Sequence, residues 1–89
     1  MTTDELIIEV KKGLGISIDS NEKIDPVIKQ KVLAVKSFMK NAGVTDENMN
    51  SDLAIGVIVM GVNDIWESKA GEVKFSPAFS TLVTQLASG

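Results

Sequence analysis

Residues 51–69 read SDLAIGVIVMGVNDIWESK, and every position from Leu53 to Val62 is apolar or glycine. The β-branched residues here would also suit a buried strand. However, no turn signal appears before Glu67, and typical strands end after roughly 4–8 residues. We therefore predict a helix. Because a helix that is apolar nearly all round must be buried on nearly all sides, it is either the axle of a compact bundle or partly covered by another subunit.

The chain before this stretch predicts two amphipathic helices. Thr2 and Glu5 have the spacing of a capping box, and the apolar residues after them share one helical face, with Gly13 as the expected end. That face consists of Leu6, Ile7, Val10 and Leu14. Residues 15–23 are expected to form a loop, in which Ile16 and Ile18 alternate as if both contacted the core.

The second helix is expected to begin at Asp25-Pro26, with Asp25 as N-cap and proline at the first helical position. Its apolar stripe consists of Ile28, Val32, Val35 and Met39, widened by Val27 and Phe38. The other side carries Lys29, Lys31, Lys36 and Lys40. Such a row is more often a solvated face than a site for an acidic partner. Residues 41–43, Asn-Ala-Gly, are expected to end the helix.

The remaining segments complete the expected architecture. Residues 45–50 read as a polar turn with at most one helical turn, and Ser51 or Asp52 caps the long helix, which ends at 69–71. Gly56 and Gly61 each cost about 1 kcal/mol in a helix, which suggests a close backbone approach or simple small-residue packing. Ser76-Pro77 starts a last helix. We predict an all-α fold: one domain over 1–89, a compact bundle of about four helices with a short loop or extended segment before the last.

Composition argues against catalysis. The chain lacks His, Cys, Arg and Tyr, so the usual general base, the strongest nucleophile and the bidentate phosphate ligand are missing. The net charge of −3 argues against a protein that neutralises phosphates, and the apolar run is shorter than the ~20 residues of a spanning helix. The N-terminus is acidic where a signal peptide is basic. We expect a soluble intracellular protein that is not an enzyme and uses no cofactor or metal.

Three acidic or aromatic groups have competing interpretations. Asp46, Glu47 and Asp52 surround a turn but lack the ligand ladder of a calcium loop, so a cation site is not expected. Asp64, with Glu67 one turn later, is expected to mark where the long helix emerges into water. Trp66 fits either a core anchor or a subunit interface.

A carrier domain is one alternative. Acyl carrier proteins are small, acidic, four-helix domains whose modified serine lies in Asp-Ser-Leu at a helix start. Here the order at 51–53 is Ser-Asp-Leu, and the triplet lies too far along the chain, so Ser51 fits a plain N-cap better. The broader alternative to an assembly protein is a small monomeric helical binding module, such as a carrier domain or a prophage regulator.

The second half of the chain resembles the small head–tail connector, or adaptor, proteins of tailed bacteriophages and prophages. In these, a long apolar helix ends in an aromatic residue followed by Glu and a polar pair, then a variable loop and a short proline-started helix. Residues 64–69 (DIWESK), 71–76 and 77–86 have that order, and an Asp-rich turn at 18–22 before an amphipathic helix matches the first half. Family members often carry Arg after the aromatic-Glu pair and near the C-terminus; this chain has none.

The resemblance implies a structural role at the head–tail interface of a virion assembled in the host bacterial cytoplasm. Copies would form a ring of the dodecamer type beneath the portal protein, extend the DNA channel, and hold the next connector or tail component. DNA would pass without specific binding, and no membrane would be involved. The expected subunit or portal contacts are the open side of the long helix and the loop at 70–77. The candidate residues are Trp66, Lys69, Glu72, Val73, Lys74, Phe75 and Pro77.

Overall fold

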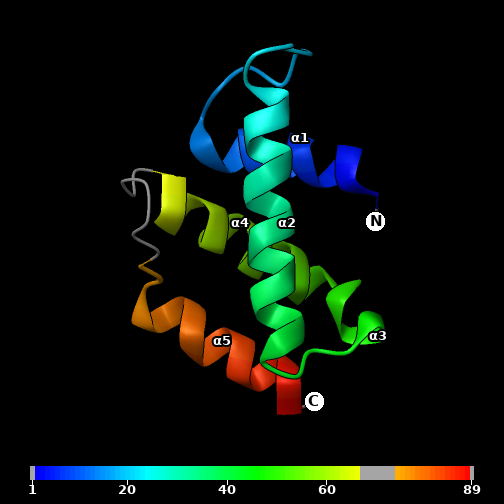
Figure 1. Ribbon diagram of the computed structural model, residues 1–89, viewed down its shortest axis with the longest axis vertical. Coiled ribbons are helices and arrows are strands. Elements are labelled where there is room, and N and C mark those ends of the chain that lie inside the picture. The colour runs from blue at the N-terminus through cyan, green and yellow to red at the C-terminus, as the bar shows by residue number, and fades with distance from the viewer. Residues whose placement is uncertain (1, 67–73, 89) are drawn as a thin grey trace.

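The computed structural model describes residues 2–66 and 74–88, and this part of the chain contains five helices and no strand (Figure 1). They are α1 (Thr3–Leu14), α2 (Asp25–Asn41), α3 (Asp46–Met49), α4 (Asp52–Trp66) and α5 (Pro77–Ser88). In the view of Figure 1, α2 crosses in front of α1 and α4. The predicted all-α bundle is confirmed. The single turn of α3 lies in the segment expected to hold at most one helical turn.

Helix α4 is the axle of the bundle. It packs against α1, α2, α3 and α5, and six of its residues are buried. They are Ala54, Val57, Ile58, Gly61, Val62 and Ile65. The open side of α4 includes Leu53, which is exposed, and Gly56, above which no atom lies within 4 Å of an added Cβ. The other helices of one chain therefore cover most, but not all, of this apolar helix.

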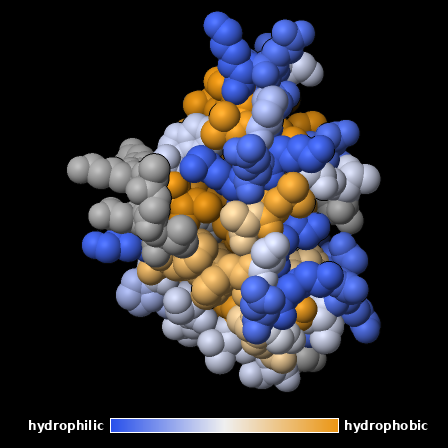
Figure 2. Space-filling view, viewed as in Figure 1, coloured by the Kyte–Doolittle hydropathy of each residue, from blue (hydrophilic) through white to orange (hydrophobic). Residues whose placement is uncertain are grey.

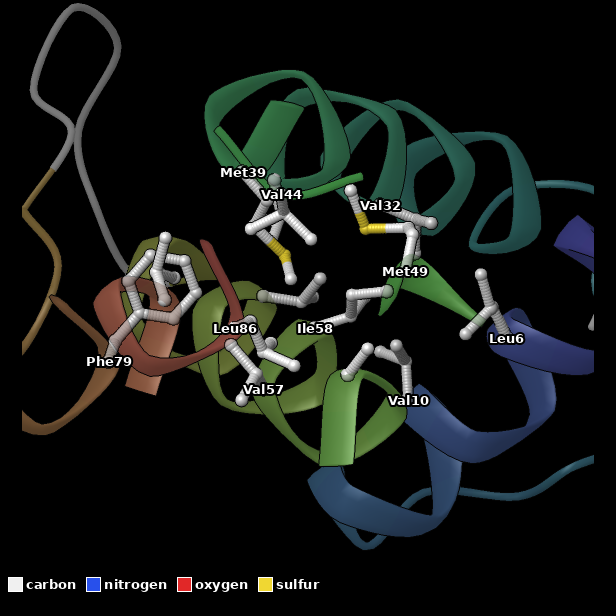
Figure 3. Packing of buried hydrophobic residues seen from close by; sticks show 14 of the residues in the cluster. Leu6, Val10, Val32, Met39, Val44, Met49, Val57, Ile58, Phe79 and Leu86 are labelled. Carbon is white, nitrogen blue, oxygen red and sulfur yellow. The ribbon is translucent and has the colours of Figure 1, made fainter. Parts of the chain in front are cut away.

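A single hydrophobic cluster joins the helices (Figure 3). Val10 from α1, Met39 from α2, Met49 from α3 and Phe79 from α5 surround the buried residues of α4. Gly61 lets these elements approach closely, since a Cβ there would lie 2.8 Å from Val35 Cγ1 and 2.5 Å from Phe79 Cε1. Close approach is thus the role of Gly61, whereas Gly56 faces open space.

The start of α1 is as predicted and its end is not. Thr2 and Glu5 form the capping box, with the Glu5 N–H donating to Thr2 Oγ1 and the Thr2 N–H donating to Glu5 Oε1, both at 3.2 Å. The helix continues past Gly13 to Leu14, and Gly15 ends it in the left-handed conformation at φ 72°. Gly13 instead lies against α4, because a Cβ there would overlap Val59 Cγ1.

Helix α2 begins differently from the prediction, because Asp25 is a helical residue and not the N-cap. The turn before it is held by Asn21, whose Oδ1 accepts hydrogen bonds from the N–H groups of Lys23 (2.9 Å) and Ile24 (3.0 Å). Asp25 reaches back to accept the Asn21 N–H at 3.2 Å. Asn21 therefore does the capping expected of Asp25, and the Asp25 carboxylate takes up a second role described below.

Four apolar residues assigned to the core by the sequence are exposed. Ile16 and Ile18 lie in the loop between α1 and α2, and Val27 and Phe38 lie on the outer half of α2. The loop is held to α1 by a polar contact, in which the Lys11 ammonium donates to the Asp19 carbonyl at 2.9 Å. Period-2 alternation was a wrong guide in the loop because this polar anchor fixes the backbone without burying the isoleucines.

Candidate interaction surface

The three phenylalanines of the chain form one cluster from two distant segments. Phe75, just before α5, stacks on Phe79 with ring centroids 4.3 Å apart and also contacts Phe38 of α2 at 4.7 Å. Phe79 is fully buried, whereas 41% of Phe38 is exposed. The cluster thus runs from the core to the surface, and its outer rings offer aromatic area to a partner.

Trp66, the last described residue of α4, extends this aromatic surface. Its side chain packs against the edge of the core and is half-buried, and the Lys31 ammonium lies 5.8 Å from a ring centroid, within the range of a cation–π contact. Lys31, Ala34 and Phe38 follow one another at helical spacing along one side of α2. We call the surface made by Lys31, Ala34, Phe38, Trp66, Lys74 and Phe75 the aromatic patch. Figure 2 shows hydrophobic surface interrupting hydrophilic surface on the face where α2 lies.

A polar link between α4 and α5 positions Phe75. The Asp64 carboxylate accepts hydrogen bonds from the Ser76 N–H (2.9 Å) and hydroxyl (2.8 Å). The same Ser76 oxygen accepts the Phe79 N–H at 3.2 Å, so it is the N-cap that the Ser76-Pro77 pair predicts. The expectation that Asp64 simply emerges into water is wrong, because it is half-buried and holds the start of α5.

The structure brings together some of the predicted contact residues. Trp66 and Phe75 lie in the aromatic patch, both half-buried, and Lys74 and Pro77 are exposed beside them. Lys69, Glu72 and Val73 lie outside the described residues. Lys31 and Phe38 are not among the predicted contact residues, because the helical pattern of α2 assigns Lys31 to a solvated face and Phe38 to the core. The sequence predicts that Lys31 and Phe38 lie at helical spacing on α2. It does not predict that α4 and residues 74–75 lie beside them.

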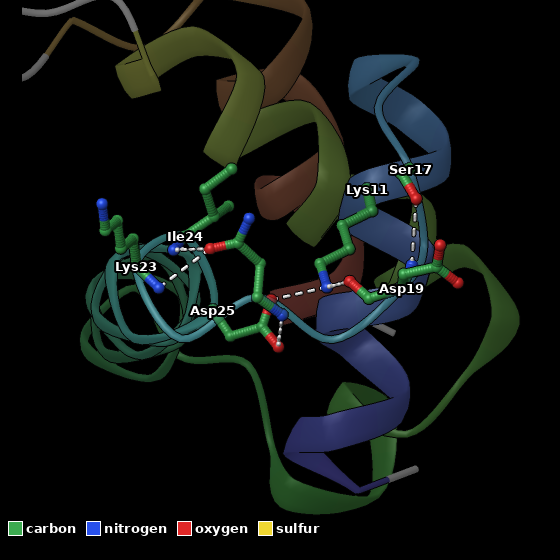
Figure 4. Close-up of polar contacts among 7 residues, drawn as sticks. Lys11, Ser17, Asp19, Lys23, Ile24 and Asp25 are labelled. Carbon is green, nitrogen blue, oxygen red and sulfur yellow. Dashed lines mark hydrogen bonds and ion pairs between the residues drawn. The ribbon is translucent and has the colours of Figure 1, made fainter.

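An ion pair between a buried lysine and a partly exposed aspartate lies at the opposite end of α2 (Figure 4). Lys11 of α1 is only 2% exposed, and its ammonium contacts the Asp25 carboxylate while donating to the Asp19 carbonyl. The hydrogen bond from Lys11, helped by that from the Asn21 N–H, lowers the pKa of Asp25 below its ordinary value. This contact joins α1, the following loop and α2. Sequence reasoning missed it because Lys11 reads as a surface residue.

The other sites considered from the sequence either have a structural role or are not found in the described residues. Ser51 donates to the Asn48 carbonyl at 2.8 Å and accepts the Ala54 N–H at 3.1 Å, as an N-cap does. Asp46 pairs with Lys40 at 3.2 Å. Across residues 2–66 and 74–88, no three acidic side chains are placed to hold a metal ion. Within the same ranges, no helix has both the length and the apolar character needed to cross a bilayer.

A comparison with models of protein families finds no match for this chain. Comparisons with curated proteins and with solved structures find none either.

Proposed function

We propose that the protein is a non-enzymatic head–tail connector of a tailed phage or prophage, acting through self-association into a ring. The observation that carries the proposal is the aromatic patch, which presents three of the chain's four aromatic residues, from α2, the end of α4 and the segment before α5. Interface cores are enriched in aromatic residues. The family resemblance, which extends over nearly the whole chain, includes the same two segments.

The proposed mechanism is one of assembly. Each subunit would contact its neighbour through two different surfaces, and such heterologous contacts generate a closed ring when the rotation between copies closes. The ring would dock beneath a portal protein in the virion and extend the DNA channel towards the tail. An acidic protein suits a channel wall to which DNA does not adhere.

Native mass spectrometry over a concentration series, with negative-stain images of the same samples, tests the proposal. We expect closed rings of a single stoichiometry. Phe75→Asp should abolish the rings while far-UV circular dichroism retains the helical signal, because a carboxylate would be buried in the patch on association. A wild-type chain that stays monomeric at every concentration would contradict the ring and favour a monomeric helical binding module. Normal rings from Phe75→Asp would remove this residue from the interface.

A further inference from the structure

A groove lies at the end of the molecule where the loop between α1 and α2 turns. It consists of two adjoining hollows of about 510 Å³ and about 320 Å³ that share Asp4, Ile7, Ser20 and Asp25 in their walls. This size is within the roughly 300–1,000 Å³ typical of pockets that take side chains or small ligands. We call it the N-terminal groove.

The groove is apolar inside with acidic side chains around it. Ile7, Ile8 and Ile18 line it, and Ile18 is 52% exposed although the sequence placed it in the core. Asp4 and Glu22 are exposed at its walls, while the charge of Asp25 is already balanced by Lys11. Lys29 also lines the groove, so its lining carries three acidic and two basic side chains, a net charge of −1. The unfilled apolar surface thus lies in a negative region.

The aromatic patch has the complementary character. The patch contains two lysines and no acidic residue. Lys31 and Lys74 lie within the patch, beside the partly exposed ring of Phe38 and the half-buried ring of Trp66. The aromatic patch therefore combines apolar side chains with lysines. The N-terminal groove combines apolar side chains with exposed carboxylates. Surfaces of this kind attract each other during encounter and fix each other's register.

We propose that the N-terminal groove receives the aromatic patch of a second copy of this chain. Phe38 and Trp66 would cover the isoleucines of the groove, and Lys31 and Lys74 would face Asp4 and Glu22. The proposal rests on the self-association proposed above and names its two surfaces. A second copy would cover only the parts of these side chains that are still exposed, which is 41% of Phe38 and less than the whole of the half-buried Trp66, and the charges would supply orientation.

The position of the two surfaces on one subunit allows both to be used at once. They share no residue: on α2 the groove extends from Asp25 to Lys29 and the patch from Lys31 to Phe38. The two surfaces are thus neighbours along α2, and Pro26 and Phe38 at their far ends are about 18 Å apart along the helix. Figure 1 shows the first turn of α2 and the segment before α5 in different parts of the molecule. The contact is therefore heterologous, and repeated copies form a ring or an open chain.

Charge reversal of each surface tests the contact by sedimentation velocity and native mass spectrometry. The groove variant is Asp4→Lys with Glu22→Lys, and the patch variant is Lys31→Glu with Lys74→Glu. Each alone should self-associate at least about tenfold more weakly than the wild type, because like charges then face each other. Mixed in equal amounts, the two should co-assemble, since the intact patch of one meets the intact groove of the other and the two reversed surfaces also carry opposite charges. Combining all four substitutions should restore self-association, because the signs are exchanged.

Glu47→Lys and Lys12→Glu are the matched controls, since both residues are exposed and lie outside the two surfaces. These variants should associate like the wild type, and circular dichroism of every variant should match it. A groove variant that still associates normally, or a mixture that does not co-assemble, would overturn the proposal. A wild-type chain that never associates would overturn it as well.

The outcomes also separate this proposal from the connector function. Closed rings that neither reversal affects would overturn the groove contact and leave the ring intact as a proposal. Conversely, co-assembly in the mixture together with open chains from the wild type would support the groove contact and contradict the ring.

Discussion

Single residues decide how closely the helices approach one another. Gly61 is buried on α4, with Phe79 of α5 and Val35 of α2 lying where a side chain would be. Gly56, five residues earlier on the same helix, faces open space. The sequence places both glycines on the long apolar helix but does not tell them apart, because the distinction depends on which side of α4 the other helices cover.

These two glycines make a matched pair for a stability measurement. Gly61→Ala should lower the free energy of unfolding by about 1–3 kcal/mol, because the added methyl overpacks Phe79 and Val35. Gly56→Ala should raise it by up to about 1 kcal/mol, because alanine is the better helix former and has room. Urea denaturation of both variants measures the difference. Equal effects from the two substitutions would contradict the close packing at Gly61.

The Lys11–Asp25 pair predicts a dependence of stability on pH. The folded state lowers the pKa of Asp25, so the stabilisation is complete above the unfolded value of about 3.9 and is lost as the pH falls towards the lower folded value. Asp25→Asn should therefore lower the melting temperature at neutral pH, and its difference from the wild type should shrink below about pH 4. Thermal denaturation over a pH series measures this.

The double variant with Lys11→Met is the control for that experiment. Methionine keeps the buried stem of Lys11 and removes the ammonium, the largest cause of the lowered pKa. Adding Asp25→Asn to Lys11→Met should then produce a smaller and less pH-dependent change. A difference between Asp25→Asn and the wild type that is constant with pH would contradict the ion pair.

At the scale of whole elements, the sequence predicts what local chemistry dictates. The capping box at Thr2 and the N-cap at Ser76 are local signals between residues three apart, and the structure contains both. The predicted N-cap of α2, Asp25, is wrong because two side chains near the start of the helix can accept hydrogen bonds from its backbone N–H groups. Asn21 caps the turn, while Asp25 is drawn to Lys11, which is fourteen positions away in the sequence. No periodicity encodes such a tertiary contact.

The link between α4 and α5 predicts a measurable loss when its hydroxyl is removed. Ser76→Ala deletes both the cap of α5 and one hydrogen bond to Asp64, so unfolding should become easier by about 0.5–2 kcal/mol. Ser80→Ala, on the exposed side of the same helix, should be nearly neutral. Chemical denaturation compares the two. A Ser76→Ala variant as stable as Ser80→Ala would show that Asp64 does not depend on this hydroxyl to hold α5.

At the scale of the molecule, the spacing of apolar residues predicts the core better than it predicts the two candidate contact surfaces. Helical spacing identified Ile28, Val32, Val35 and Met39 as buried, and all four are. The two candidate surfaces each combine residues from three segments: the patch joins α2, α4 and residues 74–75, and the groove joins α1, its following loop and α2. Trp66 and Phe75 could be nominated from sequence because they flank one loop. Phe38 and Ile18 could not be nominated in this way, because whether they are exposed depends on which other segments pack over them.

Trp66 tests whether the patch serves the fold or the assembly. A fully buried aromatic such as Phe79 should cost about 3–5 kcal/mol when truncated to alanine. Trp66 is only half-buried, so Trp66→Ala should cost less than Phe79→Ala in the unfolding free energy of the monomer. If its exposed part is the surface that a second copy covers, the same substitution should abolish association at concentrations where the variant is still folded. Native mass spectrometry and thermal denaturation of one sample give both quantities. A variant that loses as much stability as Phe79→Ala but assembles normally would assign Trp66 to the core and remove it from the interface.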